Sequence, residues 1–119
     1  MDRIWVVKVS VYDSYEGEND MIVSTHRTEV GANTVAEELR KKKAIFALTG
    51  GMTDYYDDPD TVLGLVEDQS SEIADDLRQE AAKPGVIFIE AAMKVAQKHK
   101  DEGNINLAEV SVSSGELKD

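Results

Sequence analysis

The sequence contains no cysteine among its 119 residues, which excludes disulfides, thiolate metal sites and cysteine nucleophiles and fits a reducing cytosol. It also lacks a long apolar run, because the run that begins at Ile4 is interrupted at Lys8 and Ser10 and is too short for a signal-peptide core or a membrane span. Neither Gly-x-Ser-x-Gly nor Gly-x-Gly-x-x-Gly occurs, and Gly50-Gly51 lacks the Gly-Lys-Ser/Thr of a phosphate loop. We therefore expect a cytoplasmic protein without a cofactor, rather than an enzyme or a membrane protein.

Basic residues are scarce between residues 54 and 80, a stretch called the acidic segment below. Arg78 is its only base against ten carboxylates, so it carries nine of the chain's eleven net negative charges. The other 92 residues hold 14 acids and 12 bases. Solubility does not require such a concentration of one sign, and a pI near 4.5 argues against direct contact with nucleic-acid phosphates. A positively charged partner is expected. The ten carboxylates are Asp54, Asp57, Asp58, Asp60, Glu67, Asp68, Glu72, Asp75, Asp76 and Glu80.

Two basic clusters stand outside this segment, one at residues 40–43 and one formed by Lys94, Lys98, His99 and Lys100. We expect each to close a helix, where cations interact favourably with the negative end of the helix dipole. His99 and the other histidine, His26, are expected to be surface or capping residues rather than catalytic bases.

Strand patterns occur at both ends of the chain. Residues 3–12 alternate with Trp5, Val7, Val9 and Val11 on one face, which predicts a half-buried strand. The polar stretch 13–20 predicts an acidic turn, residues 21–25 a returning strand, and residues 105–112 a final strand. An N-terminal hairpin with one C-terminal strand should therefore form a small, mainly antiparallel sheet.

Helical patterns fill the middle of the chain. Thr28 is a suitable cap for a helix that reaches residues 40–43, and residues 44–48 fit either a continuation of it or a buried strand. Asp58-Pro59 predicts the start of a helix that reaches about residue 82, with a break at Gly64 or Ser70-Ser71 left open. Residues 86–100 predict a packed helix. The pattern favours one α+β domain over residues 1–119, with three to four helices on one face of the sheet.

A charge stripe is the strongest functional signal in the acidic segment. Asp68, Glu72, Asp76 and Glu80 recur every fourth residue, with Asp75 beside them. In a continuous helix these neighbours would repel one another by a few tenths of a kcal/mol per pair. The repulsion predicts compensation by a cationic surface, supplied either by a partner or by the basic clusters of this chain or of a second copy.

Two tyrosines precede the stripe in the run Asp54-Tyr55-Tyr56-Asp57-Asp58. Tyrosine is common at interface hot spots, and neighbouring carboxylates pair with Arg or Lys of a partner. Adjacent loop tyrosines cannot easily both be core residues. The predicted partner-binding residues are Tyr55, Tyr56, Asp57, Asp58, Asp68, Glu72, Asp75, Asp76 and Glu80.

Metal binding finds less support in the sequence. An EF-hand loop starting at Asp58 would place Val62 and Leu63 where an oxygen ligand and a glycine are required. Asp57, Asp58 and Asp60 sit where carboxylates stabilise a helix N-terminus, so they need no Mg²⁺. We therefore expect no metal.

One enzyme alternative stays open. Glu37-Glu38 and Glu72-Ile73-Ala74-Asp75 resemble the Mg²⁺-binding pieces of helical nucleotide pyrophosphohydrolases of the MazG type, although Lys41 stands where the family's third glutamate is expected. The resemblance implies a phosphohydrolase in which Glu37, Glu38, Glu72 and Asp75 converge in a buried cleft. A third alternative is a structural homodimer, in which the acidic helix pairs with the basic clusters of a second copy.

Residues 1–43 combine an opening Ile-Trp-Val-Val-Lys-Val strand, an acidic turn, a second strand and a helix that starts at Thr-Glu-Val and reaches Arg-Lys-Lys-Lys. This arrangement resembles small accessory proteins encoded by bacteriophages. The resemblance implies an acidic inhibitor that blocks or redirects a factor in the host cytoplasm, such as an anti-defence protein. A DNA mimic would need further acids on the same face, because the stripe offers one charge per about 6 Å against one per about 1.7 Å in duplex DNA.

Overall fold

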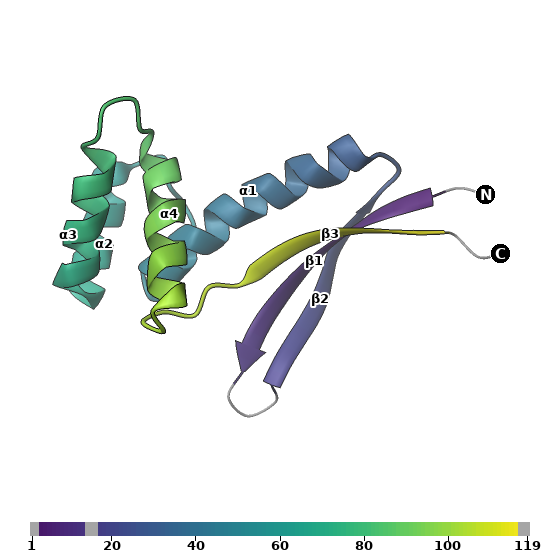
Figure 1. Cartoon of the computed structure of the whole chain (residues 1–119), viewed down its shortest axis with the longest axis horizontal. Helices are drawn as coiled ribbons and strands as arrows, with labels where there is room; N and C mark the ends of the chain where they lie inside the picture. Colours follow the sequence, from purple (N-terminus) through teal and green to yellow (C-terminus); the bar gives the residue numbers. More distant parts are fainter. Residues whose placement is uncertain (1–2, 14–16, 117–119) are drawn as a thin grey trace. The chain divides into compact units, whose positions relative to one another are not determined.

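The computed structural model describes residues 3–13 and 17–116, and within them the α+β prediction is confirmed. Three antiparallel strands form one sheet, which combines the N-terminal hairpin with a C-terminal strand (Figure 1). Four helices follow the hairpin in the sequence and precede the C-terminal strand. The chain divides into two compact units, residues 1–40 with 108–119 and residues 41–107. The expectation of one domain stays a prediction. The elements are β1 (Arg3–Asp13), β2 (Gly17–His26), α1 (Glu29–Leu48), α2 (Pro59–Gln69), α3 (Ser71–Ala81), α4 (Phe88–Asp101) and β3 (Glu109–Glu116).

The first unit contains the sheet, in the order β2-β1-β3. Val7 and Val9 of β1 pair with Val112 and Val110 of β3, so their side chains share one face of the sheet. The first half of α1 covers this face with Ala32 and Ala36, both fully buried. Small side chains on the helix allow its backbone to approach the valines closely. The predicted alternation of β1 is confirmed at Val7 and Val9, whereas Val11 is 42% exposed.

The hairpin strands extend further than predicted. β2 begins at Gly17 rather than at residue 21, because Asn19 and Asp20 pair in register with Val11 and Ser10 of β1. Backbone pairing does not require apolar side chains on an exposed edge strand, so the polar stretch gave no signal for it. Residues 14–16 of the predicted acidic turn lie outside the described residues.

Helix α1 begins and ends with recognisable caps. Thr28 accepts a hydrogen bond from Gly31 N at 3.1 Å, as its predicted capping role requires. The ambiguous residues 44–48 continue the helix, which ends at a Schellman motif: Gly51 N donates to Phe46 O and Gly50 N donates to Ala47 O, with Gly50 at φ +64°. The helix therefore runs past the 40–43 basic run, so the prediction that this run closes a helix is wrong. In the first unit Arg40 donates to Val110 O at 3.2 Å.

Helices α2 and α3 are separated at Ser70. This residue is extended, at φ −162° and ψ 116°, and its backbone N donates to Val66 O at the end of α2. Its hydroxyl accepts from Ile73 N at 3.3 Å and caps α3. The open question of one helix or two is thus answered by a serine that ends one helix and starts the next.

The second unit has its own apolar core. Ile45 and Leu48 at the end of α1 lie in one buried cluster with Val66 of α2, Leu77 of α3 and Val95 of α4. Alanines at positions 74, 91, 92 and 96 are also buried there and permit close approach of the helices. In the described part of the chain, no helix combines the length and the apolar character needed to cross a membrane.

Candidate protein-binding surface

The loop before α2 separates the two tyrosines. Tyr56 packs against the helical core, whereas Tyr55 is 61% exposed. A hydrogen bond with Asp57, together with the charge of Asp57, raises the pKa of Tyr55. Tyr56 is therefore partly a core residue, whereas the exposed ring of Tyr55 can contact a partner. This agrees with the expectation that two adjacent loop tyrosines cannot easily both be core residues.

Asp58 caps α2, as its position before Pro59 predicted. Its carboxylate accepts from Thr61 N at 3.4 Å and from Thr61 Oγ1 at 2.8 Å, and these bonds lower its pKa. Because both contacts stabilise the start of the helix, a structural role accounts for Asp58. Its availability to a partner is correspondingly reduced.

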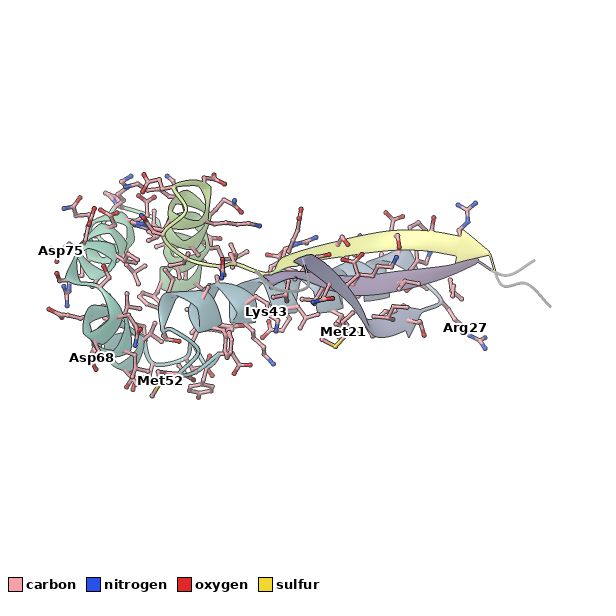
Figure 2. The ribbon with its side chains drawn as sticks, turned by 90° about the horizontal axis from the view of Figure 1, so that it is seen from below. Met21, Arg27, Lys43, Met52, Asp68 and Asp75 are labelled. Carbon is pink, nitrogen blue, oxygen red and sulfur yellow. The ribbon has the colours of Figure 1, made fainter. Side chains whose placement is uncertain are left out.

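The predicted stripe is not continuous. Asp68 lies near the end of α2 and Glu72 in the first turn of α3, and extended Ser70 between them breaks the four-residue spacing. Asp68 and Asp75 both carry side chains on the outside of their helices (Figure 2). The repulsion expected between Asp68 and Glu72 in one helix therefore does not apply to this pair.

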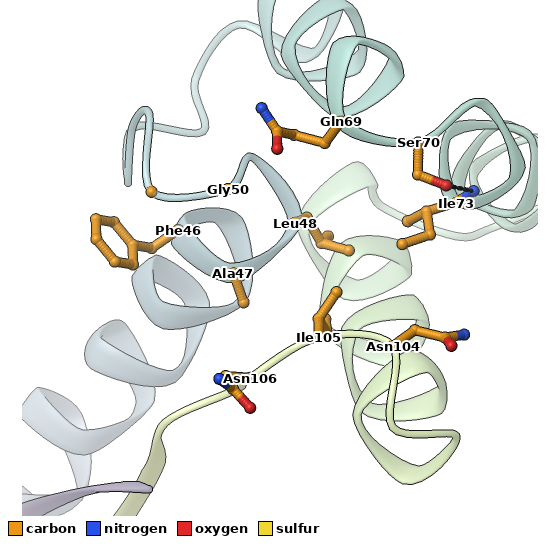
Figure 3. A pocket seen from close by; sticks show the side chains of 11 residues that line it. Phe46, Ala47, Leu48, Gly50, Gln69, Ser70, Ile73, Asn104, Ile105 and Asn106 are labelled. Carbon is orange, nitrogen blue, oxygen red and sulfur yellow. Dashed lines mark hydrogen bonds between the residues drawn. The ribbon is translucent and has the colours of Figure 1, made fainter. Parts of the chain in front are cut away.

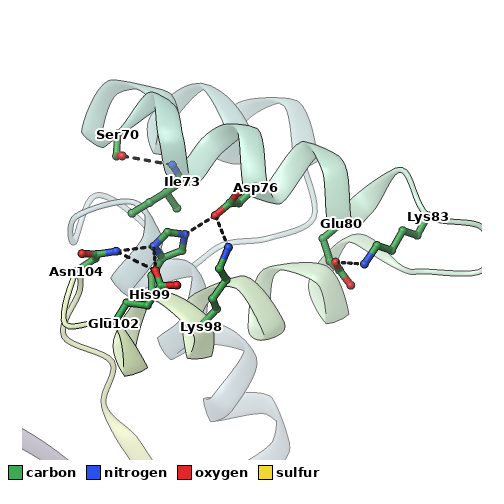
Figure 4. A network of polar contacts seen from close by, with 9 residues as sticks. All are labelled: Ser70, Ile73, Asp76, Glu80, Lys83, Lys98, His99, Glu102 and Asn104. Carbon is green, nitrogen blue, oxygen red and sulfur yellow. Dashed lines mark hydrogen bonds and ion pairs between the residues drawn. The ribbon is translucent and has the colours of Figure 1, made fainter.

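Asp76 is engaged by α4. Its Oδ2 lies 3.0 Å from Nζ of Lys98 and 2.8 Å from Nε2 of His99 (Figure 4). The hydrogen bond from Lys98, followed by that from His99, holds the pKa of Asp76 below its ordinary value. The basic cluster of the same chain thus supplies the compensation at this position.

Glu80, one turn further along α3, is also paired within the chain. Its two oxygens lie 2.7 Å from Nζ of Lys83 and 2.8 Å from Nζ of Lys94. These bonds lower the pKa of Glu80, whose side chain is only 14% exposed. Asp76 and Glu80 therefore help to hold α3 against α4.

Arg78, the only base of the acidic segment, is shared by two carboxylates. It forms an ion pair with Glu67 of α2 and another with Asp75 at 3.1 Å. The bond with Glu67 contributes most to raising the pKa of Arg78. Both acids are partly neutralised, and the pair with Glu67 connects α2 to α3.

His99 is wrongly predicted as a surface residue, since it is 1% exposed. Its Nδ1 lies 2.9 Å from Nδ2 of Asn104, and its Nε2 contacts Asp76. The sequence does contain a signal for this burial, because His99 follows Ala92 and Val95 at helical spacing on the apolar face of α4. Its polar contacts come from Asp76 of α3 and from Asn104 beyond the end of α4, and the periodicity of α4 reveals neither of them.

The carboxylates of the enzyme alternative are not buried within their own units, as that alternative requires. Glu37, Glu38, Glu72 and Asp75 are all exposed, and Glu37 pairs with Arg40 at 3.6 Å. Among the residues that the structure describes, no three His, Cys, Asp or Glu side chains are grouped so as to hold a metal ion. The geometry lends this alternative no support.

Apart from Asp58, which caps α2, five carboxylates of the acidic segment form no ion pair with a base in residues 3–13 and 17–116. We call them the unpaired acids: Asp54, Asp57, Asp60, Asp68 and Glu72. All five are exposed. The charge of Glu72 contributes to raising the pKa of Lys98, after the larger effect of Asp76, but no salt bridge joins Glu72 to Lys98.

Comparisons with protein-family models, with curated proteins and with solved structures find no match for this chain. Its function is therefore inferred from its own residues.

Proposed function

We propose that this chain is a non-enzymatic protein-binding module whose unpaired acids, with Tyr55 beside them, bind a positively charged surface of another protein. The observation that carries the proposal is that some acids of the acidic segment are paired with bases of the same chain and others are not. Asp76 and Glu80 of α3 are paired with Lys83, Lys94 and Lys98, whereas the unpaired acids of the loop before α2, of α2 and of the first turn of α3 have no such partner in the described residues.

The exposed side of α2 is compact enough for a charged contact. Asp60, Gly64 and Asp68 follow one another at four-residue intervals, so they lie along one side of the helix. All three are exposed, and a side chain on Gly64 would meet nothing within 4 Å. Tyr55 adds apolar contact area near the start of this helix, with a hydroxyl already oriented by Asp57.

A partner whose basic surface normally holds nucleic acid fits this chemistry best, because such surfaces concentrate Lys and Arg. Occupation of that surface by the unpaired acids would make the chain an inhibitor. The resemblance of residues 1–43 to bacteriophage accessory proteins supports the same proposal and suggests a factor of the host cytoplasm as the target.

Affinity capture with matched charge reversals tests this function. The immobilised chain would be exposed to a host extract at low salt and eluted with rising salt, in parallel with Asp68→Lys/Glu72→Lys. The control Glu90→Lys/Asp101→Lys reverses two exposed acids of α4 and makes the same change in net charge.

We expect the wild type and the control to retain a nucleic-acid-binding protein that elutes late, and Asp68→Lys/Glu72→Lys to lose it. Circular dichroism of all three would confirm the fold. Equal retention by the two double variants would show that only the overall charge matters and would contradict the proposal.

A further inference from the structure

A pocket of about 560 Å³ lies within the second unit (Figure 3). The last turn of α1 forms one wall, the junction of α2 and α3 another, and residues 104–106 the third. Pockets that bind small molecules have volumes of roughly 300 to 1,000 Å³. The size of this pocket therefore suits a small organic molecule.

The lining contains no charged side chain, although charged residues make up 31% of the chain. Ala47, Leu48, Ile73 and Ile105 give it apolar surface. A charged ligand would lose part of its hydration there without gaining an opposite charge, which is unfavourable. The lining therefore favours an uncharged ligand.

Four polar side chains also line the pocket, and two of them are already used. Ser70 caps α3, and Asn104 contacts His99. The amides of Gln69 and Asn106 form no hydrogen bond within the described residues. Each amide carries donors and an acceptor, so each can exchange hydrogen bonds with a polar group of a ligand. Gln69 lies at the end of α2 and Asn106 on the segment before β3 (Figure 3).

The wall formed by α1 is fixed by its own structure. Gly50 has a φ of +64°, and a Cβ added to it would lie 2.5 Å from Oε1 of Gln69. Thr49 is fully buried, and its hydroxyl donates to Ile45 O at 2.8 Å. The turn therefore cannot shift without breaking buried contacts, and a preformed site loses less entropy when a ligand binds.

We propose that this pocket binds an uncharged small molecule with an apolar ring or chain and an amide-like edge. The apolar residues contact the ring or chain, and the amide of Gln69 or of Asn106 exchanges hydrogen bonds with the carbonyl and N–H groups of the ligand. This site is independent of the unpaired acids.

Three probes of nearly the same shape test the charge selectivity. Benzamide is neutral, benzoate is an anion and benzamidinium is a cation. In titrations followed by two-dimensional NMR, we expect benzamide to shift the backbone amides of Phe46, Gly51 and Ile105. Benzoate and benzamidinium should bind at least about tenfold more weakly. Equal binding of the three probes, or benzamide shifts confined to other residues, would overturn the proposal.

Two near-isosteric variants test the hydrogen bonds. At least one of the variants Asn106→Leu and Gln69→Met should weaken benzamide binding about three- to tenfold, and that variant identifies the amide that contacts the ligand. Toluene, which has no polar group, should bind both variants as well as it binds the wild type, and this shows that the pocket is still formed. Unchanged benzamide binding in both variants would overturn the assigned contacts. Asp68→Lys/Glu72→Lys should bind benzamide normally, so failure of the proposed function and failure of this site can be told apart.

Discussion

Nε2 of the buried His99 lies 2.8 Å from Oδ2 of Asp76, and this contact joins α4 to α3. The Nδ2 atom of Asn104 can only donate, so Nδ1 of His99 accepts from it and Nε2 carries the proton that points to Asp76. Asp76, which the sequence predicts as a partner-binding residue, is thus the hydrogen-bond acceptor for the buried ring of His99. Asp76 is therefore a structural acid, unlike the unpaired acids, which can contact a partner.

Removal of this acceptor should destabilise the protein. We expect Asp76→Ala to lower the free energy of unfolding by about 1 to 3 kcal/mol, because a buried N–H of His99 loses its partner. Glu72→Ala, at an exposed position of the same helix, should change it by less than about 0.5 kcal/mol. Urea denaturation of the two variants measures both values. If Asp76→Ala is no less stable than Glu72→Ala, the structural role of Asp76 is wrong.

The same contacts predict how stability depends on pH. Lys98 and His99 lower the pKa of Asp76 in the folded protein, so its charge favours folding above the unfolded pKa of about 3.9. This contribution is lost as the pH falls through the lower folded pKa. We expect wild type to exceed Asp76→Asn in stability near pH 6, and the difference to shrink below about pH 4. Urea midpoints between pH 2 and pH 6 check this, and a difference independent of pH would contradict it.

Two glycines should respond in opposite ways to alanine. Gly64 lies within α2 with nothing within 4 Å of an added Cβ, so Gly64→Ala should stabilise the protein by about 0.5 to 1 kcal/mol. Gly50 has a positive φ and faces Gln69 closely, so Gly50→Ala should destabilise it by about 1 kcal/mol or more. Thermal denaturation compares the two. A loss of stability in Gly64→Ala would mean that α2 is constrained at this point in a way that the structure does not show.

The alternation of apolar side chains and the residues typical of helix starts made several elements of the fold predictable from the sequence. The alternation around Val7 and Val9 predicted a half-buried strand, and Asp58-Pro59 predicted the start of α2. Residues 44–48 could not be assigned, because a short apolar run fits a buried strand as well as a helix. The Schellman motif at Gly50 and Gly51 shows that they continue α1.

The acidic segment was harder to interpret because its pairing is mostly tertiary. Asp76 and Lys98 are 22 residues apart, and only the packing of α3 against α4 brings them together. Spacing along one helix reveals like-charge repulsion but not an ion pair with another helix. The sequence therefore overstated the number of acids available to a partner, and the break at Ser70 removed the continuous stripe.

Binding through the unpaired acids is tested most directly by the salt dependence of affinity for the captured partner. The dissociation constant would be measured from low to high salt for wild type, Asp68→Lys/Glu72→Lys and Glu90→Lys/Asp101→Lys. We predict that the first pair weakens binding at least about tenfold at low salt, that the difference narrows as salt rises, and that the control stays near wild type. Equal affinities of the two double variants at every salt concentration would contradict the central claim.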